Sequence, residues 1–489
     1  MEPIGTITQY FSFVDEKTKD ILEKIMIEAL DYYDFVLKLD DLVLRTESPI
    51  MVVYLAIHHS ILAYEYKLID KIREKYGHHQ ILGPNLFFAS AYQGAYEDVK
   101  KVHELADAIL AAQPEDWIAL EMLLLKFEAD MRAYPTTIYQ TSTVDEIQKR
   151  IECNPEFGFY ETVLNDNLEI RATADGDSEE RIRCLDRGLQ IAEKFDDKLS
   201  FTHLLIRKAN LIMNYNRKES KELLEKAYSI VDKWLGIPIN FADIITYLSI
   251  LRAIRGEFDT AIEGFLKAVT IRERAGLNSG NPSYYLSTFY NLIGEPESGL
   301  EWGRMAEDQF RSRPHLVNRA ILNQAWSLII LDRATEAQIL IDTINESILK
   351  SGDESQLAWL HFVTGILEID NGDISSALDS IEQALRIYER PGTAILMELI
   401  FLYQLAKVEV LSRNSEEVLS PSLALLEERA ISEDLPGYLG EVLLLKADIA
   451  IANNDDALLR EIIPQIRSLS ENEDLKFLKI RFESLQNKL

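Results

Sequence analysis

Apolar residues in the C-terminal half of the chain recur at helical spacing, in pairs of segments separated by short turns. The clearest pair covers residues 242–271, where an apolar first segment and a turn at 255–258 precede a second amphipathic segment. The second segment carries apolar residues three and four positions apart: Ile262, Phe265, Ala268 and Val269. Residues at these spacings share one face of an α-helix. The pattern therefore predicts a helical hairpin, and residues 359–388 repeat it.

Small residues recur in register with these hairpins. One series lies in the first helix of each pair and another opens the second helix, and both advance in steps of 38–41 residues. The first series is Ala209, Ser249, Ser287, Ala325, Gly365, Ala406 and Ala447, and the second is Ala261, Gly299, Ala337, Ala377, Val418 and Leu459. Because two helices pack closely only where the side chains between them are small, we predict a stack of hairpins.

The hairpin at residues 242–271 carries a motif at its turn and second helix. Residues Gly256-Glu257-Phe258-Asp259-Thr260-Ala261-Ile262, followed by Phe265 and Ala268, resemble the tetratricopeptide repeat. The usual repeat has about 34 residues, and the longer step is similar to that of the superhelical domains of MalT-like bacterial regulators. The resemblance covers residues 201–466 and implies a right-handed α-solenoid, in which the first helices line a concave, partner-binding surface.

The repeat weakens towards the N-terminus, and the chain divides into three predicted regions. Residues 1–80 form a helical N-terminal module, residues 81–200 contain diverged helical hairpins, and residues 201–489 contain tetratricopeptide-like superhelical repeats with C-terminal capping helices. One turn of the diverged region is expected at residues 93–96. No Pro-, Gly- or Ser-rich linker separates the regions. The predicted fold class is all-α.

The composition agrees with a chain of long helices. It has only 21 glycines and 14 prolines in 489 residues, which allows few turns, and its 47% hydrophobic content is enough for a large core. Residues that tolerate the left-handed conformation at the end of a helix occupy the predicted turns: Gly256, Gly294, Gly372, Asn414 and Asn454.

The charge and the cysteines narrow the class of partner and the compartment. Asp and Glu total 81 and Lys and Arg total 51, and the net charge of −30 argues against nucleic-acid binding and favours a basic partner. Two cysteines are no disulfide framework. No secretory signal and no apolar stretch long enough to span a membrane are visible. We therefore expect a cytoplasmic protein that makes no contact with membranes.

Enzyme motifs are scarce. Neither a Gly-rich phosphate loop nor a Gly-x-Ser-x-Gly elbow is present. In His103-Glu104-Leu105-Ala106-Asp107, the last residue stands where a helical zinc site needs a second histidine. An α/α-toroid glycosidase would need placed carboxylates on long loops, and the loops predicted here are short. The chain is therefore predicted to be no enzyme and to hold no cofactor.

Two groups of residues resemble parts of metal sites. The adjacent pairs His58-His59 and His78-His79 point about 100° apart on a helix, so neither pair chelates a metal easily, and surface or partly packed histidines are expected. Asp175 and Asp177 flank a glycine as in a calcium loop, but the next ligand positions are absent. A solvated turn is expected there, and no metal site is predicted.

The remaining candidate is the concave surface formed by the first helices. By the repeat register, its side chains are Tyr247, Tyr284, Tyr285, Phe289, Arg319, Asn323, Trp326, Trp359, Phe362, Tyr403 and Lys407. Aromatic rings with a few Arg, Lys and Asn suit peptide recognition, although these rings could instead pack between repeats. We predict a non-enzymatic scaffold or adaptor that binds a peptide segment or protein surface. The alternative is a ligand- or peptide-sensing regulatory module, resembling MalT-like sensor domains, that acts through a separate effector chain.

Overall fold

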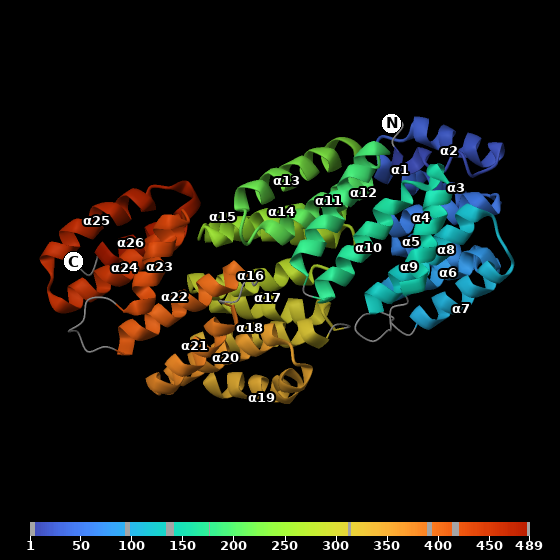
Figure 1. Cartoon of the computed structure of the whole chain (residues 1–489). Helices are drawn as coiled ribbons and strands as arrows, with labels where there is room; N and C mark the ends of the chain where they lie inside the picture. The colour runs from blue at the N-terminus through green and yellow to red at the C-terminus, as the bar shows by residue number, and fades with distance from the viewer. Residues whose placement is uncertain are drawn as a thin grey trace. The chain divides into compact units, whose positions relative to one another are not determined.

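A computed structural model describes residues 5–92, 98–133, 141–175, 177–311, 314–388, 394–412 and 420–486. In this part of the chain the regular structure consists of helices, and no strand occurs (Figure 1). The structure confirms the predicted all-α fold built from stacked helical hairpins. The turn predicted at 93–96, Asn414 and Val418 lie outside the described residues. No helix among the described residues is long and apolar enough to cross a membrane.

The chain forms two compact units. Unit 1 consists of Met1–Ile212 and Lys218–Phe241, and unit 2 of Met213–Arg217 and Ala242–Leu489. The helices before the boundary are α1 (Gly5–Thr8), α2 (Glu16–Glu28), α3 (Tyr32–Arg45), α4 (Ile50–Leu62), α5 (Tyr66–Tyr76), α6 (Gly83–Tyr92), α7 (Asp98–Ala111), α8 (Asp116–Ala133), α9 (Thr141–Cys153), α10 (Tyr160–Asp175), α11 (Ser178–Lys194), α12 (Lys198–Ile212) and α13 (Arg217–Ile230).

In unit 1 the even-numbered helices form a continuous row. Each of α2, α4, α6, α8 and α10 contacts the next even-numbered helix as well as its neighbours in sequence. Apart from α3 on α5, the odd-numbered helices of unit 1 pack on one another less, so we call the even-numbered row the inner face of the unit. Short 3-10 turns at Gln80–Leu82 and Pro155–Phe157 and a π-helical turn at Val231–Leu235 join or extend the helices.

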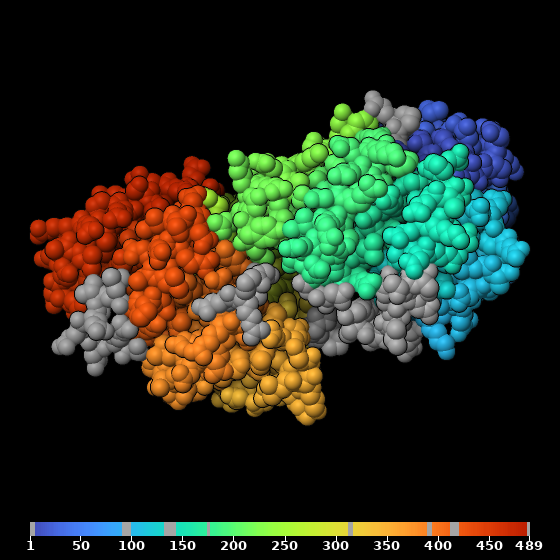
Figure 2. Space-filling view, in the orientation of Figure 1, coloured from blue at the N-terminus to red at the C-terminus, as the bar shows by residue number. Residues whose placement is uncertain are grey.

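Unit 2 continues the hairpin plan. Its helices are α14 (Pro238–Ile254, in unit 2 from Ala242), α15 (Phe258–Arg274), α16 (Gly280–Ile293), α17 (Pro296–Gln309), α18 (Pro314–Ile330), α19 (Ala334–Ser351), α20 (Glu354–Asp370), α21 (Ile374–Tyr388), α22 (Ile395–Ser412), α23 (Pro421–Ser432), α24 (Pro436–Asn453), α25 (Asp456–Ser470) and α26 (Lys476–Gln486). Figure 2 shows α20 to α25 as adjoining bands from orange to red, so consecutive hairpins are neighbours in space.

Two pairs of the small residues predicted to meet within a hairpin do so. Ser287 donates its hydroxyl to the carbonyl oxygen of Gly299 at 2.7 Å, which brings α16 against α17. A Cβ on Gly365 would lie 3.1 Å from the carbonyl oxygen of Ala377, so α20 and α21 are equally close. The predicted turns also end in left-handed residues, with φ of +87° at Gly294 and +79° at Gly372.

Unit 2 also closes on itself. The amide of Gly437, at the start of α24, donates to the carbonyl oxygen of Arg255 at 3.1 Å. The ring of Phe258 lies 5.6 Å from the ring of Tyr438 and 5.1 Å from that of Phe477. In an open solenoid each hairpin contacts only its neighbours. Here the turn between α14 and α15 contacts the last hairpins of the same unit.

Candidate functional site

The eleven predicted surface residues lie on α14, α16, α18, α20 and α22, the first helices of successive hairpins in unit 2. Their exposure divides them into two groups. Four side chains are half-buried: Tyr247, Tyr285, Arg319 and Lys407. The other seven are buried: Tyr284, Phe289, Asn323, Trp326, Trp359, Phe362 and Tyr403.

Three of the buried aromatic residues pack between repeats. The rings of Trp326 and Phe362 meet edge to face with centroids 5.0 Å apart, which joins α18 to α20. Phe362 stacks on Phe401 at 4.7 Å and Trp359 meets Phe401 at 5.5 Å, which joins α20 to α22. Trp359 is only 1% exposed. These rings stabilise the row of first helices and hold its spacing.

Two further buried residues tie α16 to its neighbours. Asn323 donates its amide to the carbonyl oxygen of Tyr284 at 3.2 Å and to the hydroxyl of Thr288 at 2.8 Å. Phe289 stacks on Phe265 with ring centroids 5.7 Å apart. A buried amide that bonds a neighbouring backbone fixes the spacing of the two helices. Asn323 and Phe289 therefore hold α16 against α18 and α15 and are not available to a ligand.

A pocket opens where α14, α15, α16 and α18 meet. It has a volume of about 110 Å³, whereas one buried water needs about 10–15 Å³. The pocket therefore has room for a single side chain or chain terminus. Its lining includes four predicted residues, Tyr247, Tyr284, Tyr285 and Arg319, together with Asp243, Thr246, Ile250, Arg272, Asn281, Phe310 and Leu316.

The two arginines of the pocket differ in their partners. Arg272 forms an ion pair with Asp243 and donates to the carbonyl oxygen of Asn278 at 2.6 Å. Arg319 donates through Nη2 to the hydroxyl of Ser355 at 2.9 Å, and its buried Nε has no partner. No carboxylate oxygen among the described residues lies within 4.0 Å of Arg319. The pocket thus contains one guanidinium neutralised by an acid and one without an acidic partner.

The acid that Arg319 influences is already engaged. Asp353 caps α20 by accepting the amides of Ser355 at 2.9 Å and Gln356 at 3.2 Å, and it also accepts the side-chain amide of Gln356 at 2.7 Å. Burial alone would raise the pKa of Asp353, but these hydrogen bonds and the charge of Arg319 hold it below its usual value. The carboxylate of Asp353 therefore serves the helix cap rather than the pocket.

Two tyrosines of the pocket, Tyr284 and Tyr285, keep their hydroxyl protons. Burial raises the pKa of both Tyr284 and Tyr285, and the charge of Arg319 only partly opposes this shift. Protonated phenols are hydrogen-bond donors and acceptors. Together with Arg319, they give the pocket several hydrogen-bond donors in a wall that also contains the rings of Tyr247 and Phe310.

Tyr403 and Lys407 are outside the pocket lining and belong to another group. Tyr403 and Arg481 both donate to the buried carboxylate of Glu441, and Arg481 lies 3.2 Å from the Tyr403 hydroxyl. Burial lowers the pKa of Lys407, and the charge of Arg481 lowers it further. The structure therefore brings four of the eleven predicted residues to one pocket, and it places these two on α22, where Tyr403 contacts Glu441 of α24 and Arg481 of α26.

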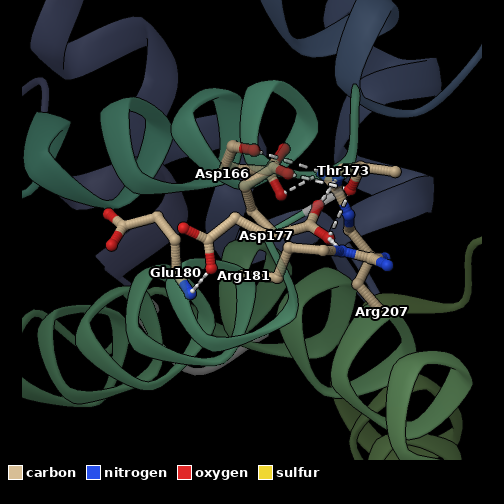
Figure 3. Close-up of polar contacts among 7 residues, drawn as sticks. Asp166, Thr173, Asp177, Glu180, Arg181 and Arg207 are labelled. Carbon is tan, nitrogen blue, oxygen red and sulfur yellow. Dashed lines mark hydrogen bonds and ion pairs between the residues drawn. The ribbon is translucent and has the colours of Figure 1, made fainter. Parts of the chain in front are cut away.

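Asp177, one of the two acids on either side of Gly176, has a structural role. Asp177 caps α11 by accepting the amide of Glu180 at 2.9 Å. Gly176 lies outside the described residues. Nearby, ion pairs around the buried carboxylate of Glu169 join α10, α11 and α12. The two arginines of these ion pairs, Arg181 and Arg207, are labelled in Figure 3. Glu169 accepts from Arg181 at 2.8 Å and from Arg207. Among the residues described, no group of three or more His, Cys, Asp or Glu could hold a metal.

Sequence reasoning missed the part of the pocket that lies off the first helices. Arg272 is on α15, a second helix, and Phe310 follows the end of α17. The sequence around each of them resembles that of many other helices and turns in the chain. No local signal marks them, because their role depends on the position of α14, α16 and α18.

Comparison with known proteins adds only distant similarities. No family model and no curated protein matches the chain. Solved structures that resemble it include a Rap protein complexed with competence and sporulation factor (13% identity, TM-score 0.47, covering 67% of this chain and 98% of that one). NprR in complex with its cognate peptide NprX (14%, 0.43, 65% and 97%) and yeast Tom70 (12%, 0.35, 90% and 96%) are also similar.

Proposed function

We propose that this chain is a non-enzymatic scaffold that binds an extended peptide segment, and that the pocket of unit 2 holds a carboxylate of that segment. The observation that carries the proposal is Arg319, a half-buried guanidinium with only a hydroxyl partner. A buried charge without a counter-ion is costly, and a guanidinium binds a carboxylate through two parallel hydrogen bonds. A ligand carboxylate would supply the missing partner.

The rest of the lining suits binding better than catalysis. The lining residues include no His, Cys or Lys, and the acid among them, Asp243, is already paired with Arg272. A nucleophile with an adjacent base is therefore missing from the pocket. Tyr247, Tyr284 and Tyr285 supply apolar area at a small entropic cost, with hydroxyls that bond an extended backbone.

The size of the pocket points to an anchor rather than to a complete ligand site. A volume of about 110 Å³ accommodates one terminal carboxylate with its side chain, or one Asp or Glu side chain. The net charge of −30 would attract basic residues elsewhere in the same peptide. We therefore expect a peptide with one carboxylate in the pocket and basic or neutral flanks.

The test is selection from two random octapeptide libraries, one with free C-terminal carboxylates and one with C-terminal amides. The intact protein should enrich peptides from the first library, and Arg319→Gln should reduce their affinity at least about tenfold, because a charge-assisted hydrogen bond is worth about 1.5–3 kcal/mol. Arg311→Gln is the matched control, since Arg311 is exposed and pairs with Asp308. The proposal fails if no peptide is enriched, or if Arg319→Gln binds as the control does.

The selected sequences separate the two sources of the carboxylate. Enrichment from the free-carboxylate library alone assigns the pocket to a chain terminus. Enrichment of peptides with an internal Asp or Glu from both libraries assigns it to an acidic side chain. Tyr285→Ala should weaken either kind of peptide, because the ring of Tyr285 is half-buried in the wall of the pocket.

A further inference from the structure

Residues 5–14 of unit 1 run along the inner face formed by its even-numbered helices. Gly5 donates its amide to the carbonyl oxygen of Asp196, between α11 and α12, at 3.1 Å. The hydroxyl of Thr6 donates to Asp197 at 2.9 Å and accepts the amide of Leu199 at 3.3 Å. A Cβ on Gly5 would lie 1.9 Å from the carbonyl oxygen of Phe195, so the backbone fits closely at this point.

The aromatic residues of the same segment reach other inner helices. Tyr10 is 2% exposed, and its hydroxyl is hydrogen-bonded to Nε2 of His58, on α4, at 2.8 Å. Its ring also meets the rings of His59 and Phe159, both at 5.8 Å. The segment is therefore held both by hydrogen bonds at Gly5 and Thr6 and by a ring pocket around Tyr10.

A second ring contact follows three residues later. The ring of Phe13 stacks on that of Trp117, on α8, with centroids 6.3 Å apart, and its centroid lies 5.3 Å from that of Phe157. Behind these rings lies a buried polar group, in which Tyr160 donates to Glu121 at 2.6 Å and His58 lies 3.9 Å from the same carboxylate. Tyr10 and Phe13 thus occupy two aromatic subsites on α4, α8 and the start of α10.

The segment has little structure of its own. Its helix, α1, has four residues, and an isolated helix of this length is unstable in water. Residues 9–13 form turns that connect it to α2. The conformation of the segment is therefore imposed by the inner face, as it is for a peptide that becomes ordered on binding.

We propose that the inner face of unit 1 is a peptide-binding surface for a Tyr-x-x-Phe segment, and that residues 5–14 are its resident, exchangeable ligand. The subsites are the His58 and His59 pocket for the tyrosine and the Trp117 and Phe157 pocket for the phenylalanine. The hydrogen bonds at Asp196 and Asp197 fix the direction of the bound segment. This surface is distinct from the pocket of unit 2, and its occupant is this chain's own segment.

The experiment uses the full chain with a protease site inserted between Val14 and Asp15, which leaves Asp15 free to cap α2. The folded protein is cleaved and mixed with a fluorescent synthetic peptide of residues 1–14, and incorporation is followed by anisotropy. The cleaved chain should take up the peptide. The uncleaved chain should take up at least about 100-fold less at the same peptide concentration, because a tethered segment has a millimolar effective concentration.

Peptide variants test the two subsites. A peptide with Tyr10→Ala should compete at least about tenfold less well, and one with Tyr10→Phe about 2–10-fold less well, since it loses only the hydrogen bond to His58. A Ser12→Ala peptide is the control, because Ser12 is exposed. The proposal is overturned if the cleaved chain stays folded but takes up no peptide within a day, or if Tyr10→Ala competes as well as the control.

A second measurement covers the case in which cleavage unfolds unit 1. In the intact chain, hydrogen exchange at residues 7–13 should be at least about tenfold faster than in α4 and α8, because the segment is released without unfolding of the helices. Exchange of the segment in step with α4 and α8 would show that it is an integral part of the core, and this also overturns the proposal.

Discussion

Replacing Asp40 by Asn should remove a pH-dependent loss of stability from unit 1. Asp40 lies on α3 and is fully buried. One of its oxygens accepts the hydroxyl of Ser60 at 2.7 Å, and the other has no partner. Burial raises the pKa of Asp40 to about 7, the bond from Ser60 opposes this, and the charge of Glu65 adds to it. The folded protein therefore prefers the neutral acid.

The magnitude follows from the difference between the folded and unfolded pKa values. The unfolded value is near 3.8, so the shift is about 3 pKa units, and each unit is worth about 1.4 kcal/mol. Because the pKa of Asp40 is higher in the folded protein than in the unfolded one, protonation of Asp40 favours folding. The stability that it contributes is fully present below about pH 4 and is lost as the pH rises towards 7. The loss should total about 4 kcal/mol, of which about 2–3 kcal/mol falls between pH 5 and pH 8.

The assay is urea unfolding at pH 5 and pH 8, followed by circular dichroism and by hydrogen exchange in α3 and α4. Asp40→Asn keeps the shape of the side chain but cannot ionise, so it should gain about 2–3 kcal/mol on the wild type as the pH rises from 5 to 8. The side-chain amide that Asp40→Asn introduces changes the free energy of unfolding by an amount that does not depend on pH. Asp41→Asn is the control, because Asp41 is exposed on the same helix. A difference between Asp40→Asn and wild type that is equal at both pH values would refute the reasoning.

Three other substitutions test the packing. Gly437→Ala should destabilise unit 2 by about 1–3 kcal/mol in calorimetry, because the new Cβ would lie 2.1 Å from the carbonyl oxygen of Gly256. An unchanged melting profile would show that the closing contact is loose. Ala325→Leu should cost a similar amount, because Ala325 is fully buried on α18, and unchanged thermal stability would mean that the predicted register is wrong there. Glu169→Gln should lower the free energy of unfolding in urea by about 1–3 kcal/mol, since two arginines share this buried carboxylate, and a smaller loss would show that their ion pairs are nearly neutral in net effect.

The hairpins could be predicted because their signals are local. Ser287 and Gly299, or Gly365 and Ala377, are close in sequence, and each pair must be small for two adjacent helices to pack. The turn glycines follow from the same local geometry, since Gly294 and Gly372 have positive φ. Four residues that line the pocket were among the eleven expected to share the concave surface, because the register of a first helix determines which of its side chains share a face.

The histidines show where local reasoning fails. His59 was expected at the surface or partly packed, but it is fully buried, and its ring is hydrogen-bonded to the hydroxyl of Tyr32 at 2.9 Å. Burial lowers the pKa of His59 far below its usual value, so the ring is neutral. Almost the whole of α4 is apolar, which marks a helix surrounded by others, and the polar partner that makes burial of His59 tolerable comes from α3.

The sequence alone determined the elements of this protein and the spacing at which they stack, because periodicity and small residues report which faces of neighbouring helices meet. The tertiary structure decided what the stack encloses. It brings Arg272 and Phe310 to the pocket of Arg319, joins Gly437 to the turn at Gly256, and lays residues 5–14 along the inner face of unit 1. These contacts join residues of different helical hairpins, and a repeat pattern carries no record of which residues meet across hairpins.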